Sequence, residues 1–260
     1  MTTRLTNTDR PGDGPPAAVD GGPHSTASPA TRVLGVLVLV ASGVLAVLGL
    51  VASPADTELG ETVRLLYVHV PVVAAAYLAI VITTVGSVAV LWKRSQWWDL
   101  VAGSAAELAT LLTALTLVTG MIWGRPTWGV FWVWDARLTS TAVLFLLLLG
   151  YLAVRRTTTD QVSRATRSAV VGMLLLPNVV IVNRSVEWWR SLHQDPTLIT
   201  LDPKIDGLQL FTLVFGIATA TLLLVWLLIH RFRVAWMAQR VEAHELDDAI
   251  AVRRAEAVGS

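Results

Sequence analysis

Two histidines are the residues of this chain best suited to bind a metal. His69 lies in "LLYVHVPVVAAAY" and His193 lies in "NRSVEWWRSLHQDP". An imidazole nitrogen is a good axial ligand for haem iron, and two opposed imidazoles complete the octahedron around it. The alternative is that each histidine only forms hydrogen bonds. The other three, His24, His230 and His244, fall in the N-terminal tail or at or beyond the end of the last apolar segment, where we expect ordinary surface residues.

A tryptophan-rich segment, "WGRPTWGVFWVWDARLTS", supplies a second candidate feature. It runs from Trp123 to Ser140 and holds Trp123, Trp128, Trp132 and Trp134. Tryptophan is enriched at membrane interfaces, so a simple anchoring belt is one interpretation. An anchoring belt spreads over many helix ends, whereas these rings cluster in one segment. We expect the glycines and the proline within the segment, Gly124, Pro126 and Gly129, to break regular helix and shape the surface that carries the rings.

Aromatic and cationic side chains near the two histidines match the needs of a porphyrin. A porphyrin is a flat apolar plate with two carboxylates, so it requires aromatic cover and cations. The candidate aromatic residues are Trp123, Trp128, Trp132, Trp134, Trp188 and Trp189. The candidate cations are Arg64, Arg125, Arg137, Arg184 and Arg190.

The composition is that of a membrane protein. The chain has 260 residues, 54% of them hydrophobic, and its mean hydropathy is +0.60, which is too apolar for an ordinary soluble domain. The net charge of +1 gives no indication of a nucleic-acid partner. Because there is no cysteine, the sequence excludes structural disulfides, iron–sulfur clusters, thiolate metal sites and a covalent haem attachment motif.

Six apolar runs predict an all-α, polytopic membrane protein with six transmembrane helices. Each is read as a helix crossing ~30 Å of hydrocarbon. The runs are residues 33–51, 65–92, 100–122, 138–154, 169–182 and 208–230. The fifth is short and contains Pro177 and Asn178, so we expect a kink there.

The charge distribution predicts the orientation in the membrane. Most of the lysines and arginines fall on the side of the two termini, which the positive-inside rule places in the cytoplasm. The outward loops are then residues 53–64, 121–137 and 183–207, so the tryptophan segment and both histidines share one face. We divide the chain into a disordered cytoplasmic tail at residues 1–31, a membrane domain at 32–231 and a cytoplasmic C-terminal tail at 232–260.

Two acidic residues have open roles. Glu107 lies inside the third predicted helix, and an ionisable group there is a functional candidate by default. Thr110 and Thr113 share its helix face, and we favour a structural role in which Glu107 forms hydrogen bonds inside the bundle. Asp135 is expected either to orient Arg137 or to cap the fourth helix.

The tryptophan segment resembles the "WWD" signature of membrane proteins that handle haem. The "HVP" of the second helix and the "VEWWRSLHQ" loop are similar to those of one branch, the CcmC family, or haem exporter protein C, of bacterial cytochrome c maturation. The resemblance covers roughly residues 60–230.

The resemblance implies a haem-binding subunit of the bacterial inner membrane that is not an enzyme. Its outer loop would hold haem b at the periplasmic face without a covalent bond and only transiently, with His69 and His193 as the two iron ligands. The implied haem-binding residues are His69, His193, Trp123, Trp128, Trp132, Trp134, Arg125, Arg137, Arg184, Trp188 and Trp189. The implied partners are the haem chaperone CcmE, which receives the haem, the ATP-binding-cassette pair CcmA and CcmB, and the small subunit CcmD.

Other functions remain open. A b-type electron-transfer subunit would need histidine ligands buried within helices, and no histidine falls in the middle of a predicted span. A membrane transporter subunit that exports haem would need polar groups along a path through the bilayer, for which Glu107, Asn178 and the threonines are a thin set. Larger haem-handling relatives of the other maturation pathway share the aromatic motif but have more helices.

Overall fold

The computed structural model describes residues 25–57, 59–158, 160–193 and 207–259. Within them the chain is helical, and the one β-contact is an isolated bridge between Asp56 and Gly60. The helices are α1 (Pro29–Val47), the π-turn η1 (Leu48–Ala52), the 3-10 turn η2 (Glu61–Leu65), α2 (Leu66–Lys93), α3 (Gln96–Trp128), α4 (Ala136–Thr157), α5 (Gln161–Met173), α6 (Leu175–Trp188) and α7 (Gly207–Gly259).

Six helical segments among the described residues are long and apolar enough to cross a membrane, which agrees with the six predicted spans. They are Pro29–Ala52, Glu61–Lys93, Gln96–Trp128, Ala136–Thr157, Gln161–Trp188 and Gly207–Ala257. The fifth span consists of α5 and α6, which are separated at Leu174. The predicted kink is therefore present. Pro177 lies in the first turn of α6, where a missing backbone N–H is tolerated.

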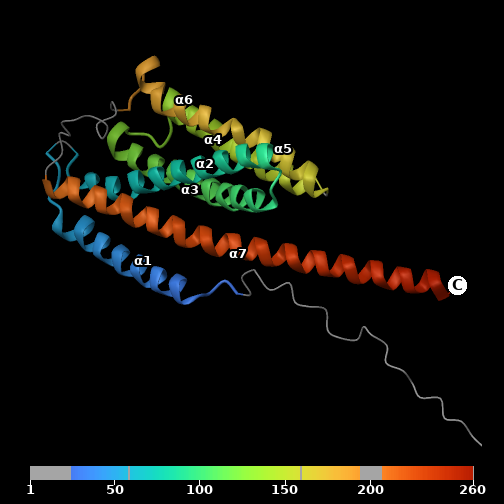
Figure 1. Cartoon of the computed structure of the whole chain (residues 1–260). Helices are drawn as coiled ribbons and strands as arrows, with labels where there is room; N and C mark the ends of the chain where they lie inside the picture. Colours follow the sequence, from blue (N-terminus) through green and yellow to red (C-terminus); the bar gives the residue numbers. More distant parts are fainter. Residues whose placement is uncertain (1–24, 58, 159, 194–206, 260) are drawn as a thin grey trace, which may run out of the picture.

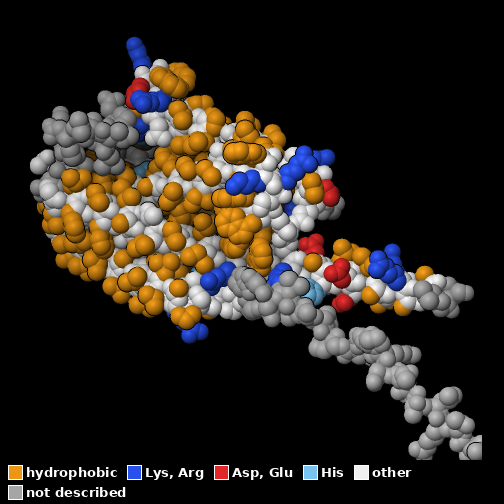
Figure 2. Space-filling model, viewed as in Figure 1, with side chains coloured by type: hydrophobic (Ala, Val, Ile, Leu, Met, Phe, Trp, Pro, Cys, Tyr) orange, Lys and Arg blue, Asp and Glu red, His pale blue; other side chains and the backbone are white. Residues whose placement is uncertain are grey.

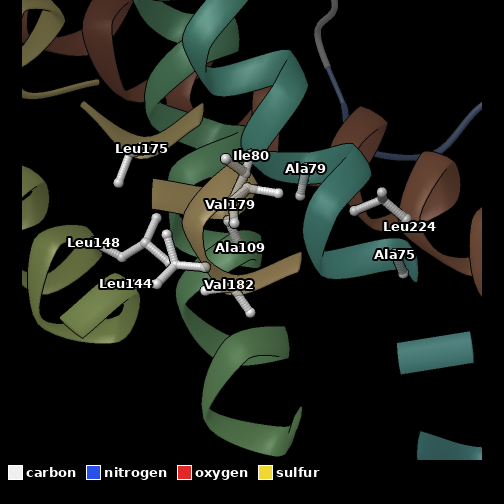
Figure 3. Packing of buried hydrophobic residues seen from close by; sticks show 10 residues of the cluster. All are labelled: Ala75, Ala79, Ile80, Ala109, Leu144, Leu148, Leu175, Val179, Val182 and Leu224. Atoms are coloured by element: carbon white, nitrogen blue, oxygen red, sulfur yellow. The ribbon is translucent and has the colours of Figure 1, made fainter. Parts of the chain in front are cut away.

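The helices form a bundle around α2 and α3, which pack along each other (Figure 1). α4, α5 and α6 lie on one side of this pair, and α7 lies on the other, with α1 packed on α7. Figure 3 shows the core where α2, α3, α4, α6 and α7 meet. Its buried residues are Ala75, Ala79, Ile80, Ala109, Leu144, Leu148, Leu175, Val179, Val182 and Leu224.

Small residues allow the helices to approach closely. A Cβ added to Gly86 of α2 would lie 3.0 Å from the Cβ of Ala102 in α3, which is the type of contact that holds membrane helices together. Apolar side chains cover most of the visible outer face of the bundle (Figure 2). Large side chains such as Leu39 and Leu146 are more than half exposed, as expected for a lipid-facing surface.

Two ends of the bundle can be distinguished. We call the end that carries the start of α2, the end of α3, the start of α4 and the end of α6 the site end. The start of α1 and the end of α7 both lie at the opposite end (Figure 1). Two ion pairs link helices away from the site end. Arg155 of α4 pairs with Asp99 of α3, and Arg231 of α7 pairs with Glu107 of α3, in agreement with a structural role for Glu107.

Three sequence expectations need correction. α3 continues through Gly124 and Pro126 and ends only at Gly129, which has a φ of 80°. The expectation that all three residues break the helix is wrong because Pro126 lies in the last turn, where its missing N–H removes at most one helical bond. α6 extends to Trp188, so the third loop begins later than residue 183. Finally, α7 remains helical far beyond the apolar run that ends at residue 230.

Candidate functional site

The two candidate ligands lie together at the site end of the bundle. His69 is in the first turns of α2, and His193 follows α6. The two imidazoles are close enough to interact electrostatically. Each ring also meets a tryptophan of α3 edge-on: His69 lies 5.7 Å from Trp123 and His193 lies 4.7 Å from Trp128, centroid to centroid. The last turns of α3 therefore connect the two histidines.

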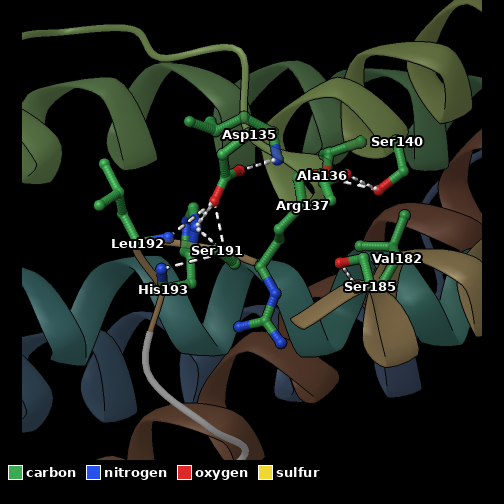
Figure 4. A network of polar contacts seen from close by, with 11 residues as sticks. Asp135, Ala136, Arg137, Ser140, Val182, Ser185, Ser191, Leu192 and His193 are labelled. Atoms are coloured by element: carbon green, nitrogen blue, oxygen red, sulfur yellow. Dashed lines mark hydrogen bonds and ion pairs between the residues drawn. The ribbon is translucent and has the colours of Figure 1, made fainter. Parts of the chain in front are cut away.

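Asp135 holds His193 in place (Figure 4). Oδ1 of Asp135 accepts a bond of 2.9 Å from Leu138 N and so caps α4. Oδ2 accepts from Ser191 Oγ and, at 3.3 Å, from Leu192 N. The same oxygen lies 2.9 Å from Nδ1 of His193. One of the two roles considered for Asp135, the helix cap, is confirmed.

The electrostatics of this pair set the protonation of His193. Burial lowers the pKa of His193 and outweighs the opposing effect of Asp135, so the imidazole is neutral near pH 7. Burial also opposes ionisation of Asp135, but hydrogen bonds from Leu138 N, Ser191 and His193 lower its pKa below the ordinary value. The ionised carboxylate can only accept, so Nδ1–H of His193 donates to it and Nε2 keeps a free lone pair.

His69 has the same tautomer as His193, with the proton on Nδ1, but a different hydrogen-bond partner. Its Nδ1 lies 2.8 Å from Oγ1 of Thr119 in α3. The Thr119 hydroxyl already donates to Leu115 O at 2.8 Å and approaches Thr116 O at 3.2 Å. The hydroxyl must therefore accept from Nδ1–H of His69, which again leaves the lone pair on Nε2.

The predicted arginines are not equivalent. Arg137 is the arginine whose charge acts on both His69 and His193. Arg125 donates to Gly129 O and lies over the Phe131 ring. Arg184 forms an exposed pair with Glu187 at 2.8 Å.

The other two predicted arginines, Arg64 and Arg190, have different surroundings. Arg64 pairs with Glu61 at 2.6 Å and donates to Gly49 O at 2.8 Å. Arg190 lines a shallow open depression together with Val133, Trp134, Asp135, Ser191 and Leu192. Of the five predicted cations, Arg137 is therefore the one that the fold brings to both histidines.

The remaining tryptophans of the candidate set form two pairs. Trp132 and Trp134 meet edge-on at 5.5 Å, and Trp188 and Trp189 meet at 5.8 Å. Trp134 is 84% exposed, so most of its ring is available for contact with another molecule. By contrast, the Nε1 atoms of Trp123 and Trp132 are buried without a hydrogen-bond partner.

The donor set fits haem iron better than a bare metal ion. Among the described residues no three histidine or acidic side chains gather in a group that could hold a metal ion. A porphyrin already supplies four in-plane nitrogens, so haem iron needs only two axial ligands. His69 and His193 present two Nε2 lone pairs, and Trp123 and Trp128 lie edge-on to their rings. Sequence reasoning singled out both histidines but missed their partners, Thr119 for His69 and Asp135 for His193, for which no local signal exists.

Comparison with known proteins agrees with this chemistry. The chain matches the CcmC family, described as heme exporter protein C, over residues 22–247. It is 39% identical over 205 residues to the heme exporter protein C of Haemophilus influenzae. The matched region covers 76% of this chain and 81% of that relative. It is 33% identical over 198 residues to that of Bradyrhizobium diazoefficiens, covering 76% and 75%. It is also similar to a putative cytochrome c biosynthesis ccmC-like mitochondrial protein of Arabidopsis thaliana, at 33% over 205 residues, covering 76% and 78%.

Proposed function

Because the chain belongs to the haem exporter protein C family, a group of multi-pass membrane proteins of haem transport in cytochrome c maturation, we propose that it binds haem at the site end and presents it for transfer. The observation that carries the proposal is the pair His69 and His193. Each Nδ1 is committed to a partner and each Nε2 is left for iron. Haem is the cargo of this site, so binding must be reversible, and a chain without cysteine cannot form the thioether bonds that hold haem permanently in c-type cytochromes.

The surrounding side chains receive roles from their positions. Trp128, Trp132 and Trp134 cover the porphyrin, and Trp123 supports the His69 ring. Arg137 pairs with a propionate because it lies within electrostatic range of both iron ligands. Arg125, Arg184, Trp188 and Trp189 form the outer margin, where they meet the exposed edge of the plate.

The proposed orientation places both termini in the cytoplasm and the site end in the periplasm of a bacterium. The excess of basic residues on the side of the termini supports it. Haem held at the site end is then accessible to the periplasmic chaperone CcmE, which takes it towards apocytochrome c. CcmA and CcmB, with CcmD, supply the ATP-driven step, and this chain itself performs no catalysis.

A haem-loading experiment tests the binding step. The purified protein is loaded with haem and its visible spectrum is recorded for the wild type and for H69A, H193A and the double variant. We expect the low-spin spectrum of iron with two histidines in the wild type and a sharp loss of bound haem in the double variant. H230A and H244A, which change histidines far from the site end, are the controls and should behave as wild type. An unchanged low-spin spectrum in the double variant would overturn the ligand assignment.

The orientation has a separate test, because the chain has no cysteine of its own. Val130 and Val252 are exposed at the two ends of the molecule, at 44% and 58%. In intact spheroplasts a membrane-impermeant maleimide should label V130C, whereas V252C should react only after the membrane is opened. The opposite pattern would reverse the orientation.

A further inference from the structure

The two histidines are held by partners of different charge. Nδ1 of His193 donates to the carboxylate of Asp135 at 2.9 Å, whereas Nδ1 of His69 donates to the hydroxyl of Thr119 at 2.8 Å. We propose that this difference makes the two iron ligands unequal. His193 is the firmer ligand, and His69 is the ligand that an incoming group displaces first. This inference rests on the proposed haem site and adds an order of release to it.

The Asp135 carboxylate strengthens His193 as a donor. A hydrogen bond to an ionised acceptor is roughly twice as strong as one between neutral groups. It draws the Nδ1 proton towards the carboxylate and raises the electron density at Nε2. Asp135 is itself fixed by Leu138 N, Ser191 Oγ and Leu192 N, so its orientation is set before haem arrives. The side chain of Asp135 is only 6% exposed, which limits competition from water.

Thr119 orients the His69 ring through a hydrogen bond to a neutral hydroxyl group. Its hydroxyl proton is used by the carbonyl of Leu115, so the oxygen accepts from His69 as an ordinary neutral group. Gly120 and Trp123 confine the ring but add no charge. Nε2 of His69 is therefore the weaker of the two donors, although its ring is well positioned.

The consequence is an ordered exchange at the iron. A donor group on the acceptor forms a bond to iron as the bond from Nε2 of His69 breaks, with no change in oxidation state. His193 keeps the haem during this step and is released only afterwards. Haem is then never without an axial ligand from one of the two proteins.

Carbon monoxide tests which ligand leaves, because it replaces the weaker axial ligand of reduced haem and its vibrations report the ligand that remains. The haem-loaded wild type, H69A and H193A are reduced and exposed to carbon monoxide, and the Fe–C and C–O stretches are measured by resonance Raman and infrared spectroscopy. We expect the adducts of wild type and H69A to coincide, since both retain His193, and that of H193A to differ. A wild-type adduct that matches H193A instead would overturn the proposal.

The alanine variants are uninformative if they retain no haem. A second pair of variants therefore keeps both histidines and changes only their hydrogen-bond partners. D135N removes the charge but preserves a good helix cap for α4, and T119V removes the hydroxyl beside His69. D135N should shift the stretches of the wild-type adduct and weaken haem binding by about 10–100-fold, whereas T119V should leave the adduct unshifted. A shift in T119V alone, or none in D135N, contradicts the proposal. D160N, which makes the same substitution at the N-cap of α5 away from the site end, is the matched control and should stay near wild type.

The two hypotheses fail in distinguishable ways. Wild-type protein that takes up no haem, or a double histidine variant with an unchanged spectrum, refutes the haem site itself. A haem site that depends on both histidines but loses His193 first refutes only the order of release.

Discussion

Gly120 of α3 lies directly against the imidazole of His69 in α2. A Cβ on Gly120 would come within 3.2 Å of Cε1 of His69, closer than almost any ordinary side-chain contact. One residue earlier, Thr119 binds Nδ1 of the same ring. Two successive residues of α3 therefore set the position and the hydrogen bond of His69, and a glycine is needed where the ring passes the helix.

Substitution of Gly120 should affect haem binding more than folding. In G120A the added methyl pushes the His69 ring away from Thr119 and from its position for iron, so we expect weaker haem binding in a titration followed at the Soret band. G120V should have a larger effect.

Gly150 of α4 provides the control, because a Cβ there would meet nothing within 4 Å. G150A should gain about 0.5–1 kcal/mol of helix stability and bind haem as wild type. Equal haem affinity in G120A and wild type would show that the contact does not position the ring.

Exposed tryptophans at the two ends of the bundle should differ in function. Trp134 at the site end is 84% exposed and Trp92 in the last turn of α2 is 82% exposed. Neither ring contributes much to the core, so W134A and W92A should unfold at nearly the wild-type temperature. Because Trp134 covers the porphyrin in our proposal, W134A should weaken haem binding roughly two- to tenfold. W92A should not, and comparable losses in both would indicate a general effect on the membrane surface.

The buried pair of Arg155 and Asp99 should be important for stability. The two side chains are only 16% and 3% exposed, and Arg155 also reaches Ser168 of α5. R155M leaves the Asp99 carboxylate buried without its partner, which we expect to cost about 3–5 kcal/mol, measured by thermal or denaturant unfolding in detergent micelles.

The exposed pair of Arg184 and Glu187 gives a comparison within the same protein. Its side chains are 56% and 40% exposed, so R184A should change the free energy of unfolding by about 0–1 kcal/mol. If R155M proved as mild as R184A, the link between α3, α4 and α5 would not depend on this ion pair.

Gly172 of α5 should be the glycine least tolerant of substitution. A Cβ there would lie 2.2 Å from Ser87 Oγ, which is held by a bond of 2.7 Å to Thr83 O. We expect G172A to separate α5 from α2 and to cost about 1–3 kcal/mol, seen as a lower unfolding temperature. G43A in α1, where a Cβ would meet nothing within 4 Å, should be neutral or stabilising. A wild-type unfolding temperature for G172A would mean that the two helices adjust freely.

The sequence by itself predicted the six spans found among the described residues, and it singled out His69 and His193 as candidates. A span requires a run of apolar residues long enough for the bilayer, which is a property of consecutive residues and can be read from the chain. The crowding of tryptophans into one segment is likewise local. Helix ends were less certain: Pro126 and Gly124 are helix breakers by propensity, yet α3 passes through both and ends only where Gly129 adopts a positive φ.

Only the tertiary structure decided how the histidines are held. His69 and Thr119 are 50 residues apart and lie on different helices, and Asp135 and His193 are 58 residues apart. No periodicity or short motif encodes such contacts, because they depend on how α2, α3 and α4 pack and on where the chain passes after α6. Packing also distinguished the candidate arginines. The charge of Arg137 acts on both histidines, whereas Arg184 pairs with the neighbouring Glu187. The residue types suit haem chemistry, and the packing of distant segments gave the two histidines different hydrogen-bond partners.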